Sequence, residues 1–278
     1  MLMPKMGRAD TGWVMTTIDT AEDFRIGRVV SRLFNALFAN WVIFLTLATL
    51  LMAPLLLLSL YTTANFASMG ITPAGGIAPG GLGSFFRLFA LQMVIYTIFY
   101  YLLQAALVKG TITYLNDERA TLGQCLSSVL KSAGTLVVIA FLSLLGVFLG
   151  IMLLVVPGII LALMWFVIVP VCMVENTSVT QTFGRSRALT KGHRGKIFLL
   201  ILMYFALAFA IVFTTRPLLG VSMMMPKPGE LNVAYVVVGW AEQVILAALT
   251  AAGVASIYYE LRLVKEGVGA QQMAAAFD

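Results

Sequence analysis

Six long apolar runs constrain the fold of this 278-residue chain more than any other feature of its sequence. A bilayer core about 30 Å thick needs roughly 20 apolar residues in a helix that rises about 1.5 Å per residue. Runs close to that length lie at 40–61, 85–108, 135–155, 158–174, 196–214 and 233–257. The chain is therefore predicted to be an all-α polytopic membrane protein with six transmembrane helices.

The overall composition also points to a membrane environment. Hydrophobic residues make up 60% of the chain and charged residues only 11%, whereas soluble domains carry about 25% charge. A single transmembrane domain is predicted at 21–266, between a flexible N-terminal segment at 1–20 and a C-terminal tail at 267–278. The N-terminal residues lack the pattern of a cleaved secretory signal.

Basic residues are distributed unequally between the two sides of the predicted spans. Alternating loops place 15 of the 18 Lys and Arg residues on one side and only Arg87, Arg216 and Lys227 on the other. Because loops rich in Lys and Arg remain in the cytoplasm, both termini are predicted to be cytoplasmic. This asymmetry accounts for the net charge of +6 without a nucleic-acid partner.

An amphipathic helix is predicted immediately before the first span. From Ile26 to Trp41, apolar residues recur at three- and four-residue spacing, which is typical of a helix lying in the membrane interface. We expect this helix to begin near Thr20 or Asp23. Its polar face carries three arginines, Arg25, Arg28 and Arg32.

Similar interfacial helices are predicted before the third and fifth spans, at 122–133 and 179–191. Each opens with a capping box, in which a hydroxyl and an amide side chain satisfy unpaired backbone N–H groups. The two boxes are Thr121 with Gln124 and Ser178 with Gln181. We interpret the chain as three copies of one unit, an elbow helix followed by a transmembrane hairpin. The alternative is that any protein with an even number of spans yields hairpins with basic inner loops.

The third and fourth spans are predicted to form a tight hairpin at Val156-Pro157-Gly158. Gly146 and Gly150 form a small-xxx-small motif that is expected to pack the third span against the fourth. Pro170 is expected to kink the fourth span or end it early.

The stretch from Pro157 to Phe198 resembles one bacterial family. Its landmarks are Pro157-Gly158-Ile159, Trp165, Pro170, Glu175 and Arg185-Ser186-Arg187-Ala188-Leu189-Thr190-Lys191-Gly192. These residues resemble the glycerophosphoryl diester phosphodiesterase membrane-domain family and the YciC-like inner-membrane proteins, which share an R-S-x-x-L-x-x-G elbow. The resemblance implies a location in the bacterial inner membrane. It does not imply phosphodiesterase activity, which in the family belongs to a fused domain.

Glu242 is the candidate for a polar site inside the membrane. It lies about nine residues into the last span, roughly 14 Å along a helix, so it is expected near the bilayer midplane and facing the bundle interior. Gln243 and Gln92 are its expected partners. A functional Glu242 would couple protons or substrate in a small transporter or permease, whereas a structural one would be a neutral, hydrogen-bonded packing residue.

The basic inner side is the candidate for contacts with anionic lipid headgroups, because each basic residue near an anionic surface contributes about 1 kcal/mol of attraction. The alternative is that these charges only set the orientation and extend toward water. The residues concerned are Arg25, Arg28, Arg32, Arg185, Arg187, Lys191, Arg194 and Lys196.

No catalytic residue, metal site or cofactor is predicted. The single histidine, His193, and the separated cysteines Cys125 and Cys172 support neither a metal site nor a disulfide framework. The sequence therefore favours a non-enzymatic membrane protein with a lipid-related or partner-binding role, its protein partner unknown. A transporter using Glu242 is the second hypothesis. An intramembrane lipid-modifying enzyme is the third, and it would need polar residues converging at the inner side.

Overall fold

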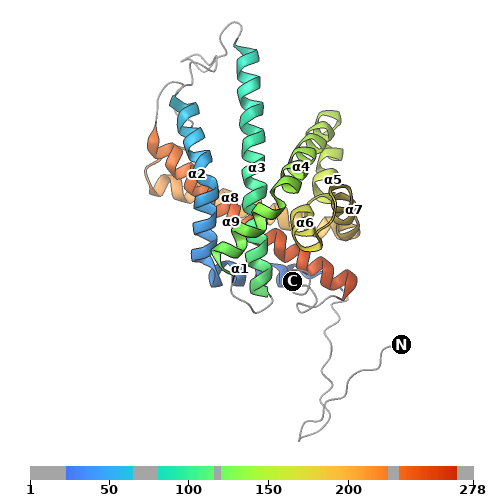
Figure 1. Ribbon diagram of the computed structural model, residues 1–278. Coiled ribbons are helices and arrows are strands. Elements are labelled where there is room, and N and C mark those ends of the chain that lie inside the picture. Colours follow the sequence, from blue (N-terminus) through green and yellow to red (C-terminus); the bar gives the residue numbers. More distant parts are fainter. Residues whose placement is uncertain (1–22, 65–80, 116–119, 225–231, 268–278) are drawn as a thin grey trace, which may run out of the picture.

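A computed structural model describes residues 23–64, 81–115, 120–224 and 232–267. The predicted segment 1–20 lies outside these residues, as does the predicted tail apart from Gly267. Within the described ranges the secondary structure is helical throughout, with these elements: α1 (Ile26–Ala39), α2 (Trp41–Ala64), α3 (Leu82–Leu115), α4 (Leu122–Leu153), α5 (Val155–Met164), α6 (Ile168–Glu175), α7 (Val179–Thr190), α8 (Arg194–Leu218) and α9 (Val233–Glu266). Figure 1 shows their arrangement.

Among the described residues, six segments are long and apolar enough to cross a membrane, which confirms the predicted fold class of an all-α polytopic membrane protein. They are α2, α3, α4, α5 together with α6, α8 and α9. Several of these helices exceed the predicted spans: α3 and α9 have 34 residues each, or about 51 Å of helix. Because the hydrocarbon core is only about 30 Å thick, such helices tilt or continue beyond it.

The elbow helices are distinct in the first and third units but not in the second. α1 ends at Ala39, directly before Asn40, and α7 ends at Thr190. Gly192 follows α7 with a φ of +89°, a conformation that only glycine adopts without strain. In contrast, the predicted elbow at 122–133 is the first part of α4, which continues without a break to Leu153. The prediction of a separate helix there was wrong, since no comparable helix-ending residue separates it from the span.

The predicted capping boxes are present at the two expected helix starts. Thr121 Oγ1 accepts from the Gln124 N–H at 3.3 Å, and Gln124 Oε1 accepts from the Thr121 N–H at 3.1 Å. Gln181 Oε1 likewise accepts from the Ser178 N–H at 3.2 Å. Both boxes satisfy backbone donors that the first helical turn leaves unpaired.

The hairpin of the third and fourth spans turns at Leu154, just before the predicted Val-Pro-Gly segment, because α5 already begins at Val155. The two glycines predicted to pack against the fourth span do so. A Cβ atom on Gly150 would lie 3.0 Å from Gly158 Cα, and one on Gly146 would lie 2.6 Å from the Trp165 ring. The small-residue motif is therefore an intramolecular seam.

The fourth span is broken between α5 and α6, as the position of Pro170 predicts. Residues 165–167 leave the helical path, and Pro170 then lies in the first turn of α6. A proline ring crowds the carbonyl of the residue four positions earlier, here Phe166, so a continuous helix through this point is disfavoured.

α9 is the central helix of the bundle and contacts α1, α2, α3, α6, α7 and α8. Almost every residue from Ala247 to Leu261 is buried, and most of the first ten are small. Small side chains allow helices to approach closely: a Cβ on Gly253 would lie 3.2 Å from Leu33 Cδ1 of α1. α8 is peripheral by comparison, with only 6% of its spanning window buried.

Candidate functional site

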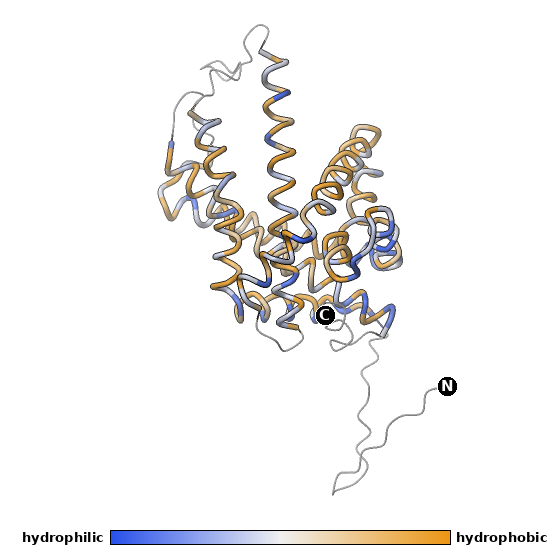
Figure 2. Tube along the Cα trace, in the orientation of Figure 1, coloured by the Kyte–Doolittle hydropathy of each residue, from blue (hydrophilic) through white to orange (hydrophobic). Residues whose placement is uncertain are grey.

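The C-terminal turns of α9 meet α1 and α7 at one end of the bundle, which we call the basic end. Ion pairs join these helices there, although they are separated by many residues in the sequence. Figure 2 shows hydrophobic colour along most of the spanning helices and hydrophilic stretches around α7 and the C-terminal end of α9. The candidate lipid-binding residues named from the sequence lie at this end.

Glu260 of α9 organises the contact between α9 and α1. Its side chain is fully buried, and its oxygens accept from Arg28 at 2.6 Å and from Arg32 at 2.5 Å. Oε1 also accepts from the backbone N–H of Arg25 at 3.0 Å. This carboxylate therefore satisfies a donor at the start of α1, where a capping side chain from the helix itself would normally act.

The position of Glu260 explains why α1 begins at Ile26 and not near Asp23, where the sequence predicted its start. Asp23 and Phe24 are not helical, and the capping carboxylate comes from a residue 235 positions away. Sequence reasoning did not single out Glu260. The available signal was a lone acidic residue directly after the apolar run that ends in Tyr258-Tyr259.

A second ion-pair network joins α6, α7 and α9. Arg185 Nε donates to Glu175 Oε2 at 2.7 Å, and the same guanidinium pairs with Glu266. The hydroxyl of Tyr258 donates to Glu175 Oε1 at 3.0 Å. Arg262 Nε donates to Glu266 Oε2 at 2.9 Å. The two carboxylates, the two guanidinium groups and the tyrosine hydroxyl of this network each bind another member of it.

The R-S-x-x-L-x-x-G segment provides the structural contacts of α7. Besides the ion pairs of Arg185, Ser186 Oγ donates to the Met164 carbonyl at 2.9 Å, which connects α7 to the end of α5. Leu189 is fully buried, and Gly192 has the positive φ that ends the elbow. Arg185, Ser186 and Leu189 thus fold the elbow against the bundle, and Gly192 ends it.

Three of the eight predicted lipid contacts have exposed side chains for which the described residues provide no hydrogen-bond or ion-pair partner. They are Arg25, Arg187 and Lys191. Arg194 is half-buried, and its Nε has no partner within the described part of the chain. The structure therefore divides the predicted set. Arg28, Arg32, Arg185 and Lys196 form ion pairs within the protein, Arg25, Arg187 and Lys191 are exposed, and Arg194 is half-buried.

The junction of α7 and α8 is held by contacts with the residues before α1. Lys196 Nζ donates to Asp23 Oδ1 at 2.7 Å and to the Phe24 carbonyl at 2.9 Å. The hydrogen bond from Lys196 lowers the pKa of Asp23. His193 stacks on Phe24, with ring centroids 5.6 Å apart. Burial lowers the pKa of His193, and the nearby Lys265 and Lys196 lower it further.

Glu242 is buried, as predicted, but its partners differ from those expected. Its oxygens accept from Thr215 Oγ1 at 2.7 Å and from Arg216 Nη2 at 3.0 Å, both from the last turn of α8. Gln243 and Gln92 are exposed instead. Gln243 directly follows Glu242, and the turn of about 100° per residue of a helix places its side chain on a different face of α9.

The pairing with Arg216 also revises the expected depth of Glu242. Arg216 lies two residues from the end of α8, so the carboxylate is level with the end of that helix although it lies about 14 Å along α9. Arg216 is only 13% exposed and lies over the Tyr235 ring at 4.7 Å. This arrangement is a neutralised ion pair near the end of the bundle opposite the basic end.

Among the described residues, no group of three or more His, Cys, Asp or Glu side chains is arranged to hold a metal ion. Cys125 and Cys172 are both buried and free. Comparisons with protein-family models, curated proteins and solved structures give no match to this chain.

Proposed function

We propose that the protein is a non-enzymatic bacterial inner-membrane protein that binds anionic phospholipid headgroups at its basic end, which faces the cytosol. The observation that carries this proposal is the division of the cationic side chains. One set folds the elbows against α9, and a second set, Arg25, Arg187 and Lys191, projects outward. Internal pairing does not require the second set, and phosphate groups of an anionic membrane surface would attract it.

The amphipathic helix α1 supports the same proposal. Val29 and Ala36 of α1 are buried against the bundle, whereas Phe38 near the end of α1 and Trp41 at the start of α2 are 69% and 57% exposed. Exposed aromatic residues beside a spanning helix are typical of the membrane interface. With Arg25 at its start, α1 presents the mixed charge and aromatic surface of an interfacial helix.

We further propose that the chain is related to the glycerophosphoryl diester phosphodiesterase membrane-domain family. The support is the elbow segment from Arg185 to Gly192, in which each shared position has a structural contact: ion pairs, a hydrogen bond to the Met164 carbonyl, a buried leucine and a positive φ. An elbow with these contacts would be a folding unit and not a catalytic centre.

The two alternative functions have less support. A transporter would use Glu242 beside a water-accessible cavity, but both oxygens of Glu242 are engaged by Thr215 and Arg216. A lipid-modifying enzyme would need free acid and base groups, whereas Glu175 and Glu266 are bound to arginines.

Native mass spectrometry of the purified protein tests headgroup binding directly. The protein would be equilibrated with equal amounts of phosphatidylglycerol and phosphatidylethanolamine, and the ratio of retained lipids measured. Replacing Arg187 and Lys191 together with glutamine is expected to lower the phosphatidylglycerol preference by up to about thirtyfold, from about 1 kcal/mol for each basic residue.

A matched control removes two charges that the sequence assigns to the other side of the membrane, with Arg87→Gln and Lys227→Gln, and should leave the preference unchanged. Labelling of a Lys191→Cys variant by an impermeant maleimide, only after the cells are permeabilised, verifies the orientation. Equal preferences in the wild type and the Arg187/Lys191 variant, or an equal loss in the control, would overturn the proposal.

A further inference from the structure

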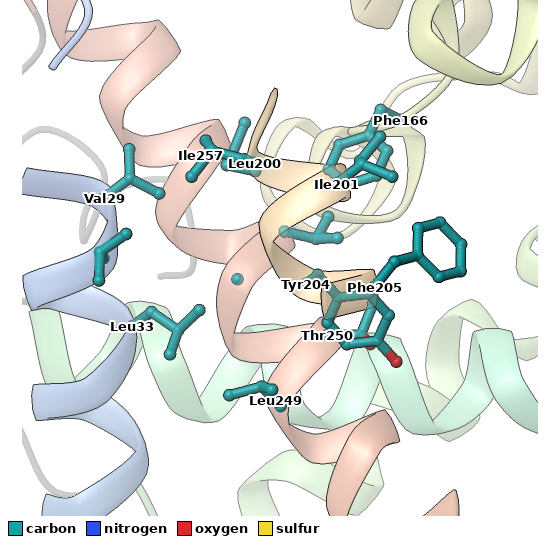
Figure 3. A pocket seen from close by; sticks show the side chains of 13 residues that line it. Val29, Leu33, Phe166, Leu200, Ile201, Tyr204, Phe205, Leu249, Thr250 and Ile257 are labelled. Atoms are coloured by element: carbon teal, nitrogen blue, oxygen red, sulfur yellow. The ribbon is translucent and has the colours of Figure 1, made fainter. Parts of the chain in front are cut away.

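An apolar groove lies between the peripheral helix α8 and the packed pair of α1 and α9. Figure 3 shows Val29 and Leu33 of α1 on one side and Leu200, Tyr204 and Phe205 of α8 on the other, with α9 forming the floor. The groove has a volume of about 200 Å³. The walls are hydrocarbon apart from the hydroxyls of Tyr204 and Thr250.

The length and position of the groove match one leaflet of a bilayer. Its lining residues on α9 extend from Leu249 to Ile257, which is about 12 Å of helix, against about 15 Å for half of a hydrocarbon core. Ile257 lies three residues before Glu260, so the groove opens next to the basic end and runs toward the middle of the bundle.

Two cations lie one helical turn from the mouth of the groove. Lys196 precedes Leu200 by four residues on α8, and Arg25 precedes Val29 by four residues at the start of α1. Lys196 and Leu200 share a face of α8, and Arg25 is the extended residue directly before α1. Lys196 is 39% exposed but pairs with Asp23 at 2.7 Å, whereas the Arg25 side chain is exposed and has no side-chain partner among the described residues. A phosphate at the mouth would therefore meet the uncompensated charge of Arg25 directly above the hydrocarbon walls.

The lining of the groove argues for a hydrocarbon occupant. Apart from the hydroxyls of Tyr204 and Thr250, the lining side chains offer no hydrogen-bonding group to a polar ligand. A hydrocarbon chain needs no hydrogen-bond partners, and Thr250 Oγ1 already donates to the Leu246 carbonyl at 2.7 Å. The chemistry of the groove therefore fits an acyl chain.

We propose that this groove holds one acyl chain of a glycerophospholipid from the leaflet at the basic end, with its phosphate beside Arg25. The proposal rests on the proposed lipid-binding function and adds a specific site to it. The bound lipid fills the space between α8 and the rest of the bundle, which the protein's own side chains leave open.

The test compares two tryptophan substitutions at adjacent positions of α8. Leu200→Trp fills the groove, whereas Leu199→Trp adds the same ring at a side chain that is 47% exposed and does not line the groove. After stepwise delipidation in detergent, native mass spectrometry counts the lipids that remain bound. We expect occupancy by the most tightly held phospholipid to fall at least tenfold in Leu200→Trp and to stay at the wild-type level in Leu199→Trp.

A second variant, Val30→Phe, fills the groove from α1 and keeps the test decisive if Leu200→Trp does not fold. Equal lipid retention in the wild type and in the folded groove-filling variants would overturn the acyl-chain site. Such a result would leave the proposed headgroup preference standing, because that preference is measured through Arg187 and Lys191. If the Arg187/Lys191 variant instead loses its phosphatidylglycerol preference but keeps the tightly held lipid, the headgroup contacts and the acyl-chain site are separate.

Discussion

Replacing Glu260 with glutamine is expected to release α1 from α9 while the spanning helices remain folded. Glutamine keeps the size of the side chain and one acceptor for the Arg25 N–H, but it removes the charge that pairs with Arg28 and Arg32. Two guanidinium groups would then lie beside a buried neutral amide.

The magnitude follows from the burial of the three groups. Removing one partner of a fully buried ion pair costs about 3–5 kcal/mol. Here the carboxylate is fully buried, but Arg28 and Arg32 retain 21% and 22% exposure, so water stabilises them partly after the change. We therefore expect a loss of about 2–3 kcal/mol from the free energy of docking α1, or roughly 30- to 150-fold more frequent opening.

Hydrogen exchange of the α1 amides in nanodiscs measures this opening directly. The matched control is Glu266→Gln, because Glu266 is 22% exposed and pairs with Arg185 of α7 and with Arg262 of α9. Pairs that are partly exposed contribute about 0.2–1 kcal/mol, so α1 exchange should change less than fivefold in the control. If Glu260→Gln leaves α1 as protected as in the wild type, the assignment of Glu260 as the main attachment of α1 is refuted.

Two other predictions concern the remaining charged contacts. Glu242→Gln is expected to reduce the stability by about 2–4 kcal/mol, because Arg216 is only 13% exposed; adding Arg216→Gln should restore part of that loss in a double-mutant cycle, and purely additive effects would exclude the pairing. The lowered pKa of His193 means that the unfolded chain binds a proton more readily near and below pH 6.5 than the folded protein does. Stability should therefore fall as the pH drops through 6.5 toward the folded pKa. His193→Gln should flatten that slope in detergent melts at pH 5 to 8, and an unchanged slope would contradict the assignment.

The membrane spans were predictable because their signal is local. An apolar run of about 20 residues has few alternatives to a transmembrane helix, and all six runs correspond to helices of that kind. The same holds for α1 and α7, for the capping box at Thr121, and for the break before Pro170. The prediction of a separate elbow helix at 122–133 was wrong because an amphipathic pattern does not mark where a helix ends. A helix continues until a residue ends it, and α4 continues to Leu153.

The candidate site was predictable only in outline. The excess of basic residues at one end follows from the sequence, but the role of each residue does not. Arg185 and Arg187 look equivalent in the sequence, yet the first is bound to Glu175 and Glu266 and the second is exposed. Glu242 was correctly expected to be buried, whereas its partners came from the end of α8 and not from neighbouring glutamines.

The sequence by itself determined that this chain spans a membrane six times, with its positive charge concentrated on one side. The tertiary structure decided which of those charges are used within the fold and which face outward. The physical reason is that hydropathy and helical periodicity act over a few turns of one helix. The partner of a buried charge, in contrast, is set by helix packing that brings together residues as distant as Arg25 and Glu260.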